Sequence, residues 1–473
     1  MKKQAYNPFL PSWEYIPDGE PHVFGGRLYI FGSHDSAGGH NYCPNDYVCW
    51  SAPIDDLTAW RYDGVIYAKT DDPGNADGSL HLFAPDVTQG PDGRYYLYYV
   101  MDKLPVIAVA VCDTPAGRYT FYGHVRYPDG TKLGERQGDE PHFDPAVLTE
   151  GDKTYLYTGF CRRNDASRHG CMATVLGMDM LTILEEPNFV IPSGCYSKDT
   201  GFEGNEYFEA PSVRKIGDTY YLVYSSLIGG ELTYATSRYP TRGFAYRGAT
   251  ISNCDLKIAT YKPAEMTVRT WGNNHGGLVE VKGQWYIFYH RHTHGTHFSR
   301  QACAEPVTVL PDGSIAQAEM TSCGLNGGPL AGRGEYPAHI ACNLFTKFEG
   351  HGQPMHHETW IDARFPKIIQ DGRDGDEVQG YITNMRDGCI AGFKYFDCRS
   401  ISKLTIKTRG YYSEGCMEIK TAWDGEPLGT IPVVSSNTWA ENSANIAIPD
   451  GVHALYFEYK GTGGPSLYSF TLE

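Results

Sequence analysis

Residues 205–226 read NEYFEAPSVRKIGDTYYLVYSS, and this stretch decides the fold because the chain repeats its pattern. It holds a carboxylate, Glu209, ahead of a short segment that mixes apolar and polar residues. A turn at Gly217 and Asp218 follows, and an aromatic segment then covers residues 220–224. Alternating aromatic and β-branched residues around a tight turn predict a β-hairpin.

The same phrase, a turn glycine followed by an aromatic run, occurs five times. The turn glycines stand 67, 58, 66 and 66 residues apart, at Gly26, Gly93, Gly151, Gly217 and Gly283. A repeat of this length that is rich in short strands is typical of a β-propeller blade. The sequence therefore predicts an all-β chain with a five-bladed β-propeller over residues 1–323.

A polar side chain stands seven or eight residues before each turn glycine. These residues are Asp18, Asp86, Asp144, Glu209 and His275. An isolated acid next to proline is most simply a turn residue. Five polar groups at matched offsets instead favour one shared pocket, because equivalent positions on innermost blade strands face the propeller axis. Converging carboxylates repel one another and raise some of their pKa values, which a purely structural core would avoid.

Several short motifs carry a resemblance to a known family over the first two-thirds of the chain. They are Asn7-Pro8, Asp18, residues 32–35 (GSHD), residues 84–87 (APDV), Asp144-Pro145, residues 209–211 (EAP), Tyr289-His290 and Arg300-Gln301. In this order and spacing they resemble glycoside hydrolase family 43, which includes β-xylosidases, α-L-arabinofuranosidases and arabinanases.

The resemblance implies an inverting mechanism with three acids. Asp18 matches the general base, Glu209 the general acid, and Asp144 the acid that raises the pKa of Glu209 and orients it. The family usually has Ala-Asp-Pro at the base, whereas this chain has Pro-Asp-Gly-Glu-Pro at residues 17–21. Matching the step before proline would place the base at Glu20, while the distance to the aromatic Tyr29 favours Asp18.

The resemblance also implies a set of binding residues. His275 matches a histidine that helps to hold a structural calcium ion, largely through waters, and its alternative is a histidine hydrogen-bonded in the axial channel. Arg300 matches a substrate-binding arginine, whose rigid donor fork suits sugar hydroxyls. The remaining candidates for contact with substrate are Asp86, His290, Phe31, Phe83 and Phe143, and for the three phenylalanines core packing is the alternative.

Two further patterns invite a metal or disulfide interpretation. Four histidines fall within residues 290–297, but the spacing of a zinc site is absent, so we interpret them as a strand end and a loop at the pocket rim. Cys43 and Cys49 have no second pair beside them and are interpreted as structural. Glu206 lies off the repeat offset and is assigned a rim or structural part.

Composition narrows the class of protein. The 473 residues carry a formal charge of −16, which argues against a nucleic-acid partner and suits a neutral substrate. No apolar run is long enough to predict a membrane span, and the N-terminus lacks the apolar core of a signal peptide. We therefore expect a cytoplasmic protein whose thirteen cysteines are free thiols.

The repeat ends before a glycine-rich segment, residues 324–335, which is predicted to be a linker. From 336 to 473 short alternating segments predict a β-sandwich, with strands over 391–396, 403–408, 416–422, 428–434, 445–448 and 453–459. Residues 392–397, 451–457 and 466–472 resemble family 6 carbohydrate-binding modules. Sugar binding there would need an exposed aromatic platform, with Trp423, Trp439, Tyr411 and Tyr412 as candidates, and a purely structural module is the alternative.

The sequence thus predicts an exo-acting glycoside hydrolase that releases xylose or arabinose, or both, from short oligosaccharides. An endo-arabinanase, a non-catalytic sugar-binding propeller and a protein-interaction scaffold are the alternatives. The presence of all three acids argues against a sugar-binding propeller without activity. A scaffold would have no need for acids on the axis.

Overall fold

A computed structural model describes residues 3–346 and 365–473 of the chain. Regular structure in these residues consists of β-strands and four single-turn 3₁₀ helices, so the all-β prediction is confirmed. The short helices are η1 (Lys69–Asp71), η2 (Pro73–Asn75), η3 (Gly324–Asn326) and η4 (Ala338–Ile340). Among the described residues, none of these short helices has the length and apolar character of a membrane-spanning helix.

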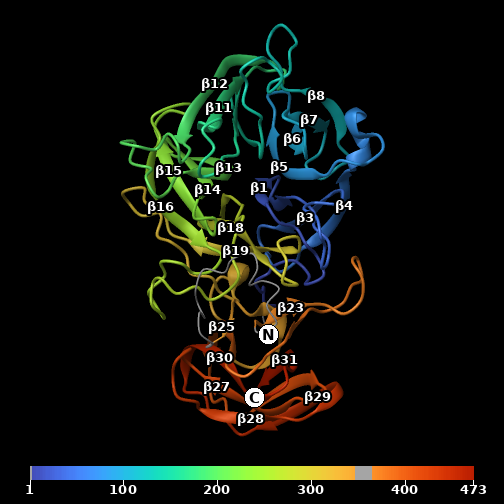
Figure 1. Ribbon diagram of the computed structural model, residues 1–473, viewed down its shortest axis with the longest axis vertical. Coiled ribbons are helices and arrows are strands. Elements are labelled where there is room, and N and C mark those ends of the chain that lie inside the picture. The colour runs from blue at the N-terminus through green and yellow to red at the C-terminus, as the bar shows by residue number, and fades with distance from the viewer. Residues whose placement is uncertain (1–2, 347–364) are drawn as a thin grey trace.

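The first two-thirds of the chain form five antiparallel sheets, each built from consecutive strands (Figure 1). The first holds β1 (Glu20–Phe24), β2 (Arg27–Phe31), β3 (Tyr47–Pro53) and β4 (Arg61–Tyr67). The second holds β5 (Leu82–Gln89), β6 (Tyr95–Met101), β7 (Ala108–Cys112) and β8 (Thr120–His124). The third holds β9 (Ala146–Glu150), β10 (Lys153–Thr158), β11 (Gly170–Leu176) and β12 (Ile183–Pro192). The fourth holds β13 (Tyr207–Ile216), β14 (Thr219–Ser226), β15 (Glu231–Ser237) and β16 (Ala245–Ser252), and the fifth holds β17 (Leu278–Val281), β18 (Gln284–His292) and β19 (Arg300–Val307).

The five predicted hairpins join the first and second strands of these sheets. In the hairpin of β13 and β14, Ile216 pairs with Thr219 across the turn at Gly217. All five turn glycines have a positive φ, from 59° at Gly217 to 85° at Gly283, which glycine adopts without steric cost. The first strands β1, β5, β9, β13 and β17 contact one another in sequence, and β17 contacts β1. They therefore close a ring around one axis.

The residues after 323 form two further sheets around a separate apolar core. One sheet runs in the order β20 (Leu330–Ala331), β25 (Cys389–Cys398), β30 (Gly451–Thr462), β27 (Glu414–Lys420) and β28 (Gly429–Val433), with β22 (Asn343–Thr346) also on β25. The other runs in the order β23 (Lys367–Ile369), β24 (Tyr381–Thr383), β31 (Ser466–Leu472), β26 (Leu404–Gly410) and β29 (Ser436–Ala444), with β21 (Gly334–Pro337) also on β31. Fully buried side chains such as Phe393, Phe457 and Leu467 fill this core.

Two details differ from the sequence-based expectation. The glycine-rich segment 324–335 is not a free connection, because Leu330–Ala331 pairs with β25 and Gly334 begins β21 on β31. Residues 445–448 are not a strand. Strand β29 ends at Ala444, and Ile448 makes only an isolated bridge to Ile401.

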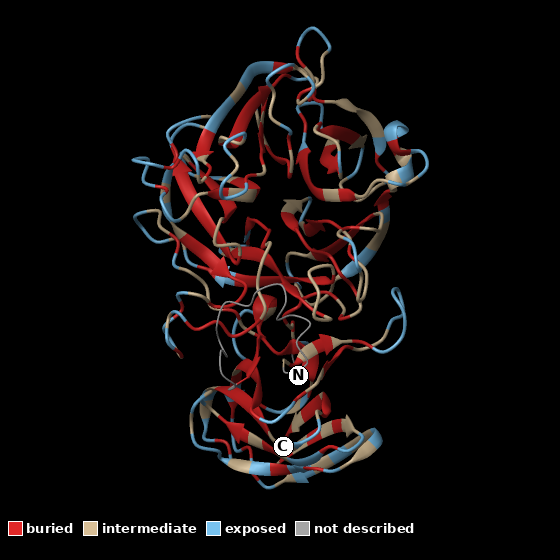
Figure 2. Cartoon of the chain, in the orientation of Figure 1, coloured by how far each residue is buried: buried red, intermediate tan, exposed pale blue. Residues whose placement is uncertain are grey.

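Figure 2 shows buried residues in red both along the strands of the ring and within the second part. The two parts also share a buried polar contact. The Nζ atom of Lys394, on β25, lies 3.0 Å from Asp255 and 2.8 Å from Glu319. Lys394 and Asp255 are fully buried. Arg291, on β18, donates hydrogen bonds to the carbonyl oxygens of His339 and Ala341. The second part therefore packs firmly on the ring of sheets.

Candidate active site

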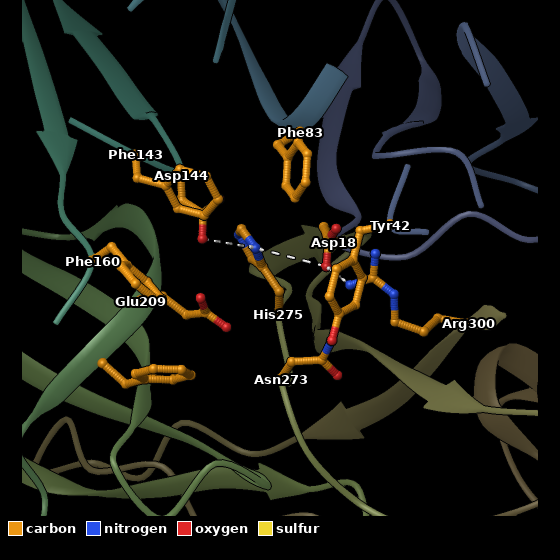
Figure 3. A pocket seen from close by; sticks show the side chains of 11 residues that line it. Asp18, Tyr42, Phe83, Phe143, Asp144, Phe160, Glu209, Asn273, His275 and Arg300 are labelled. Carbon is orange, nitrogen blue, oxygen red and sulfur yellow. Dashed lines mark hydrogen bonds and ion pairs between the residues drawn. The ribbon is translucent and has the colours of Figure 1, made fainter. Parts of the chain in front are cut away.

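A cavity of about 320 Å³ lies where the first strands of the five sheets meet (Figure 3). Its lining contains three carboxylates, one guanidinium and one imidazole among aromatic rings. The lining residues are Asp18, Tyr42, Phe83, Phe143, Asp144, Phe160, Phe208, Glu209, Asn273, His275 and Arg300. The cavity therefore gathers all three predicted catalytic acids, together with the predicted residues His275, Arg300, Phe83 and Phe143.

Unusual backbone conformations aim the acids inward. Asp18 and Asp144 each come two residues before the first strand of their sheet, and they have φ values of 56° and 46°. Ala210, next to Glu209, has φ of 64° and lies at a register irregularity of β13. Such conformations cost about 1–3 kcal/mol each for a residue with a side chain, and they concentrate at functional sites.

Arg300 holds Asp18 in place. Its Nη1 donates to Asp18 Oδ1 at 2.8 Å, while its Nε and Nη2 donate to the two oxygens of Asp35 at 2.8 and 3.1 Å. The Tyr42 ring lies over the guanidinium at 5.0 Å. Asp18 therefore faces the cavity in an ion pair with Arg300, and Asp35 holds Arg300 on the side away from the cavity.

His275 lies between two of the carboxylates. Its Nδ1 is 3.9 Å from Asp18 Oδ1 and 3.9 Å from Asp144 Oδ2, as the dashed lines of Figure 3 show. Burial lowers the pKa of His275 to about 4, despite the opposing effect of Asp18. The ring is therefore neutral near pH 7, and it separates the acids without adding a positive charge.

The pKa values of Glu209 and Asp144 are both raised. Burial is the largest cause at Glu209, the negative charge of Asp18 adds to it, and together they raise its pKa to about 8. Burial, Glu209 and Asp18 raise the pKa of Asp144, and its Oδ2 accepts a hydrogen bond from the Ala210 amide at 3.2 Å. A carboxyl group that keeps its proton at neutral pH can act as an acid, which is how carboxyl pairs divide their roles.

Aromatic rings form a continuous wall on one side of the cavity. The ring centroids of Phe83 and Phe143 are 5.6 Å apart, those of Phe143 and Phe160 are 5.6 Å apart, and those of Phe160 and Phe208 are 5.4 Å apart. All four rings are partly exposed to the cavity. Such faces are suited to packing against the C–H face of a sugar ring.

Three residues that were expected to touch substrate do not line the cavity. Asp86 is fully buried, where its carboxylate pairs with His22 at 2.6 Å and accepts a hydrogen bond from the Val147 amide. Phe31 is packed in the core of the first and second sheets. His290 is also fully buried, with its Nδ1 accepting a hydrogen bond from the Asp18 amide at 3.3 Å.

Glu20, the alternative general base, lies outside the cavity as well. Its Oε2 accepts hydrogen bonds from Arg214 at 2.9 Å and Ser212 at 3.0 Å. With His22 and Asp86 it forms the one group in residues 3–346 and 365–473 whose ligand atoms, all within 4.8 Å, have the spacing of a metal site. The histidines of residues 290–297 are not part of that group, and all thirteen cysteines are free.

Four lining residues were missed from the sequence: Tyr42, Phe160, Phe208 and Asn273. Phe208 could have been found, because it directly precedes Glu209 just as Phe143 precedes Asp144. Asn273 stands two residues before His275. Tyr42 and Phe160 lie in loops outside the repeated phrase, where no pattern marks them. Glu206 accepts hydrogen bonds from Ser197 and the Gly204 amide, so its role is structural.

Residues 8–315 match the model of "Glycosyl hydrolases family 43". The chain therefore belongs to this family, and it is a glycoside hydrolase. A protein of Thermoclostridium stercorarium named "Xylosidase/arabinosidase" is 65% identical over 472 residues, which cover 100% of this chain and 99% of the relative. A "Xylosidase/arabinosidase" of Bacteroides ovatus is 28% identical over 60% of this chain and 87% of its own length.

Solved structures give the same picture of the fold. A family 43 arabinoxylan arabinofuranohydrolase from Bacillus subtilis, in complex with cellotetraose, covers 98% of this chain and 97% of its own, with a TM-score of 0.53 and 21% identity. A family 43 β-xylosidase/α-arabinofuranosidase from a compost metagenome, in complex with xylotriose and in a calcium-free form, has a TM-score of 0.50 and 26% identity. It covers 64% of this chain and 94% of its own.

Proposed function

We propose that this chain is an inverting, exo-acting glycosidase that releases xylose, arabinose or both from pentose-containing oligosaccharides. The observation that carries the proposal is the pairing of two unlike carboxyl groups in one cavity. Asp18 is ion-paired with Arg300, whereas the pKa of Glu209 is raised to about 8. The 65% identical relative, named xylosidase/arabinosidase, supports the choice of pentoses.

In the proposed reaction Asp18 accepts a proton from a water molecule, and the water oxygen bonds to the anomeric carbon from the opposite face to the leaving group. The glycosidic C–O bond breaks, and Glu209 gives its proton to the departing oxygen. The product then has the inverted anomeric configuration. Asp144 was expected to raise the pKa of Glu209 and to orient it, but the charge that raises this pKa is that of Asp18. The proposed part of Asp144 is therefore to position Glu209, through its contact with the Ala210 amide.

The cavity supports exo action by its size and walls. About 320 Å³ lies at the lower end of the range for small-molecule sites, and the four-phenylalanine wall closes one side. Arg300, Phe83 and Phe143 are the proposed contacts with the sugar. Asp86, Phe31 and His290 would support the site from behind.

We also propose a structural calcium ion near His275. This side chain offers one imidazole nitrogen, and the nearest carboxylates, Asp18 and Asp144, belong to the reaction. Calcium prefers six to eight oxygen ligands, so these donors fit an ion held largely through waters. A bound ion would supply positive charge at the base of the cavity. Melting temperatures measured with and without a chelator test this proposal. A chelator that shifts the melting temperatures of wild type and His275→Ala by the same amount, or shifts neither, would contradict it.

The architecture is proposed to be a five-bladed β-propeller over residues 1–323 followed by a sandwich similar to family 6 carbohydrate-binding modules. The closed ring of first strands and the two stacked sheets support this. Of the candidate platform residues, Tyr411 and Tyr412 are 66% and 74% exposed. Trp423 packs near Phe345 and Trp439 near Tyr381. Free cysteines support a reducing compartment for the protein.

The decisive experiment incubates the protein with an aryl β-xyloside and an aryl α-L-arabinofuranoside. We expect the wild type to release the aryl group from at least one of the two compounds. We expect Glu209→Ala to release no pentose from a pentose-containing oligosaccharide. Proton NMR of the first-formed sugar anomer then tests inversion. Absence of release from either compound, or full activity of Glu209→Ala on oligosaccharides, would refute the proposal.

A further inference from the structure

A second cavity, of about 580 Å³, lies beside the first sheet, between the segment before β1 and the loop after β23. Its lining includes the aromatic residues Trp13, Trp50 and Tyr62 and the carboxylates of Glu14, Asp46 and Glu377. We propose that this space, here named the Trp13 cavity, is a second carbohydrate-binding site that holds a pentose oligosaccharide without cleaving it. The choice of sugar rests on the proposed function.

The aromatic side chains form a surface of fixed rings. The ring centroids of Trp13 and Trp50 are 6.0 Å apart, and those of Trp50 and Tyr62 are 5.4 Å apart. Trp50 is buried, and its Nε1 donates to Glu14 Oε2 at 2.7 Å, which fixes its orientation. Tyr62, on the outer strand β4, is 49% exposed. Trp13 is partly buried. A buried, oriented ring beside one partly buried and one exposed ring suits the apolar face of a sugar, because aromatic side chains offer large contact area with little loss of freedom.

The polar lining favours a neutral ligand with many hydroxyl groups. Glu14 is already engaged with His34 at 3.1 Å and Trp50, so it belongs to the wall. Asp46 accepts a hydrogen bond from the Lys69 amide, and Glu377 is exposed at the rim. Carboxylate oxygens accept hydrogen bonds from hydroxyl donors, and their charge repels phosphate or carboxylate ligands.

The place of the cavity gives such binding a purpose. His34 lines the Trp13 cavity, and the next residue, Asp35, holds Arg300 of the catalytic cavity. The two cavities thus lie on either side of one short segment. An oligosaccharide held in the Trp13 cavity would keep its own free end, or neighbouring oligosaccharides, near the proposed catalytic residues. This raises the local concentration of substrate there.

The second part of the molecule completes the wall. Asp374, in the loop after β23, accepts a hydrogen bond from the Ala37 amide at 2.8 Å and lies 3.4 Å from Asn45 Nδ2. Since Asp374 and Glu377 both line the cavity, the full site requires both parts of the chain.

The test measures binding of xylohexaose by calorimetry to the full chain carrying Glu209→Gln, which prevents turnover. We expect two classes of site, and loss of one class, or at least about tenfold weaker binding at it, when Tyr62→Ala or Trp13→Ala is added. Tyr239→Ala is the matched control, because Tyr239 is a 52% exposed tyrosine in the connection between β15 and β16, outside the lining of the Trp13 cavity. Unchanged binding in both Tyr62→Ala and Trp13→Ala would overturn the proposal.

Activity assays separate this inference from the proposed function. In an otherwise wild-type chain, Tyr62→Ala should leave hydrolysis of an aryl glycoside unchanged and lower hydrolysis of pentose oligosaccharides such as xylohexaose by about three- to tenfold. Failure of the enzyme proposal would appear as no hydrolysis by wild type, while the calorimetric result would still stand. If calcium raises the melting temperature, Glu377→Gln abolishes that effect and xylohexaose does not bind there, the cavity is a cation site and the proposal is wrong.

Discussion

Arg300 lies between two carboxylates, and its ion pairs organise the chemistry of the catalytic cavity. Toward the cavity it holds Asp18, and away from it the two oxygens of Asp35. Within residues 3–346 and 365–473 no cation forms an ion pair with Glu209, and burial together with the charge of Asp18 raises its pKa to about 8. The two carboxyl groups therefore differ in their surroundings: Asp18 is ion-paired with Arg300, whereas Glu209 has a raised pKa, as the proposed proton donor requires.

Asp18 and Glu20, two residues apart, should differ in their effect on activity. Asp18→Asn should lower kcat by about 10²–10⁴-fold, because it removes the proposed general base. Glu20→Gln should keep most of the activity, since Glu20 lies outside the cavity on Arg214. Steady-state kinetics on an aryl glycoside provide the measurement, with circular dichroism as the check on folding. The reverse order of effects would transfer the role to Glu20.

Activity should depend on the protonation of Glu209. A general acid must carry its proton, so kcat/KM should fall as the pH rises through the Glu209 pKa of about 8. Removing the Asp18 charge should lower that pKa, because the negative charge of Asp18 disfavours ionisation of Glu209. Carbon NMR of labelled glutamate carboxyl groups in wild type and Asp18→Asn measures the shift directly. An equal Glu209 pKa in wild type and Asp18→Asn would show that burial alone raises it.

At the scale of elements, the connection between β2 and β3 supports the cavity from one side. It carries Asp35, which clamps Arg300, and Tyr42, whose ring covers the guanidinium. The Cys43 amide also donates to Asp35 Oδ1 at 3.0 Å, which ties the loop to the same carboxylate. A loop thus supplies what the five repeated strands do not: an orienting clamp on the arginine.

Asp35→Asn should therefore impair catalysis although Asp35 does not line the cavity. Breaking one partner of a buried, hydrogen-bonded ion pair costs about 2–5 kcal/mol, so we expect kcat/KM to fall by roughly 30-fold or more. Asp55→Asn is the control, because Asp55 forms an exposed ion pair with Lys282. Equal kinetics of the two variants would show that Arg300 keeps its position without the clamp.

At the scale of the whole molecule, the two parts are joined by buried charge. Lys394 places its ammonium group between Asp255 and Glu319, and these acids raise its pKa against the effect of burial. The C-terminal part also supplies Asp374 and Glu377 to the Trp13 cavity. The second part therefore contributes to the shape of the first and is not merely attached to it.

Lys394→Met should destabilise the protein by about 3–5 kcal/mol, because it removes the cation that compensates the carboxylates of Asp255 and Glu319. Lys403→Met should cost at most about 1 kcal/mol, since Lys403 forms an exposed pair with Glu473. Thermal unfolding followed by circular dichroism compares the two. Similar melting temperatures would mean that the interface does not depend on the buried charge.

The sequence by itself determined the repeat and hence the ring of sheets. Turn glycines such as Gly217 adopt a positive φ that other residues reach only at a cost. A polar residue stands seven or eight residues before each of these glycines. This was sufficient to bring Asp18, Asp144 and Glu209 to one cavity, and to favour Asp18 over Glu20.

Only the tertiary structure decided which of the equivalent positions reach the cavity. Asp86 occupies the same offset in the repeat, but its carboxylate is buried between sheets, where it pairs with His22 and accepts a hydrogen bond from the Val147 amide. Tyr42 and Phe160 enter the cavity from loops whose course depends on contacts with distant segments. Local periodicity fixes the direction of a side chain on its own strand, whereas partners far along the chain decide whether that side chain meets another residue or open space.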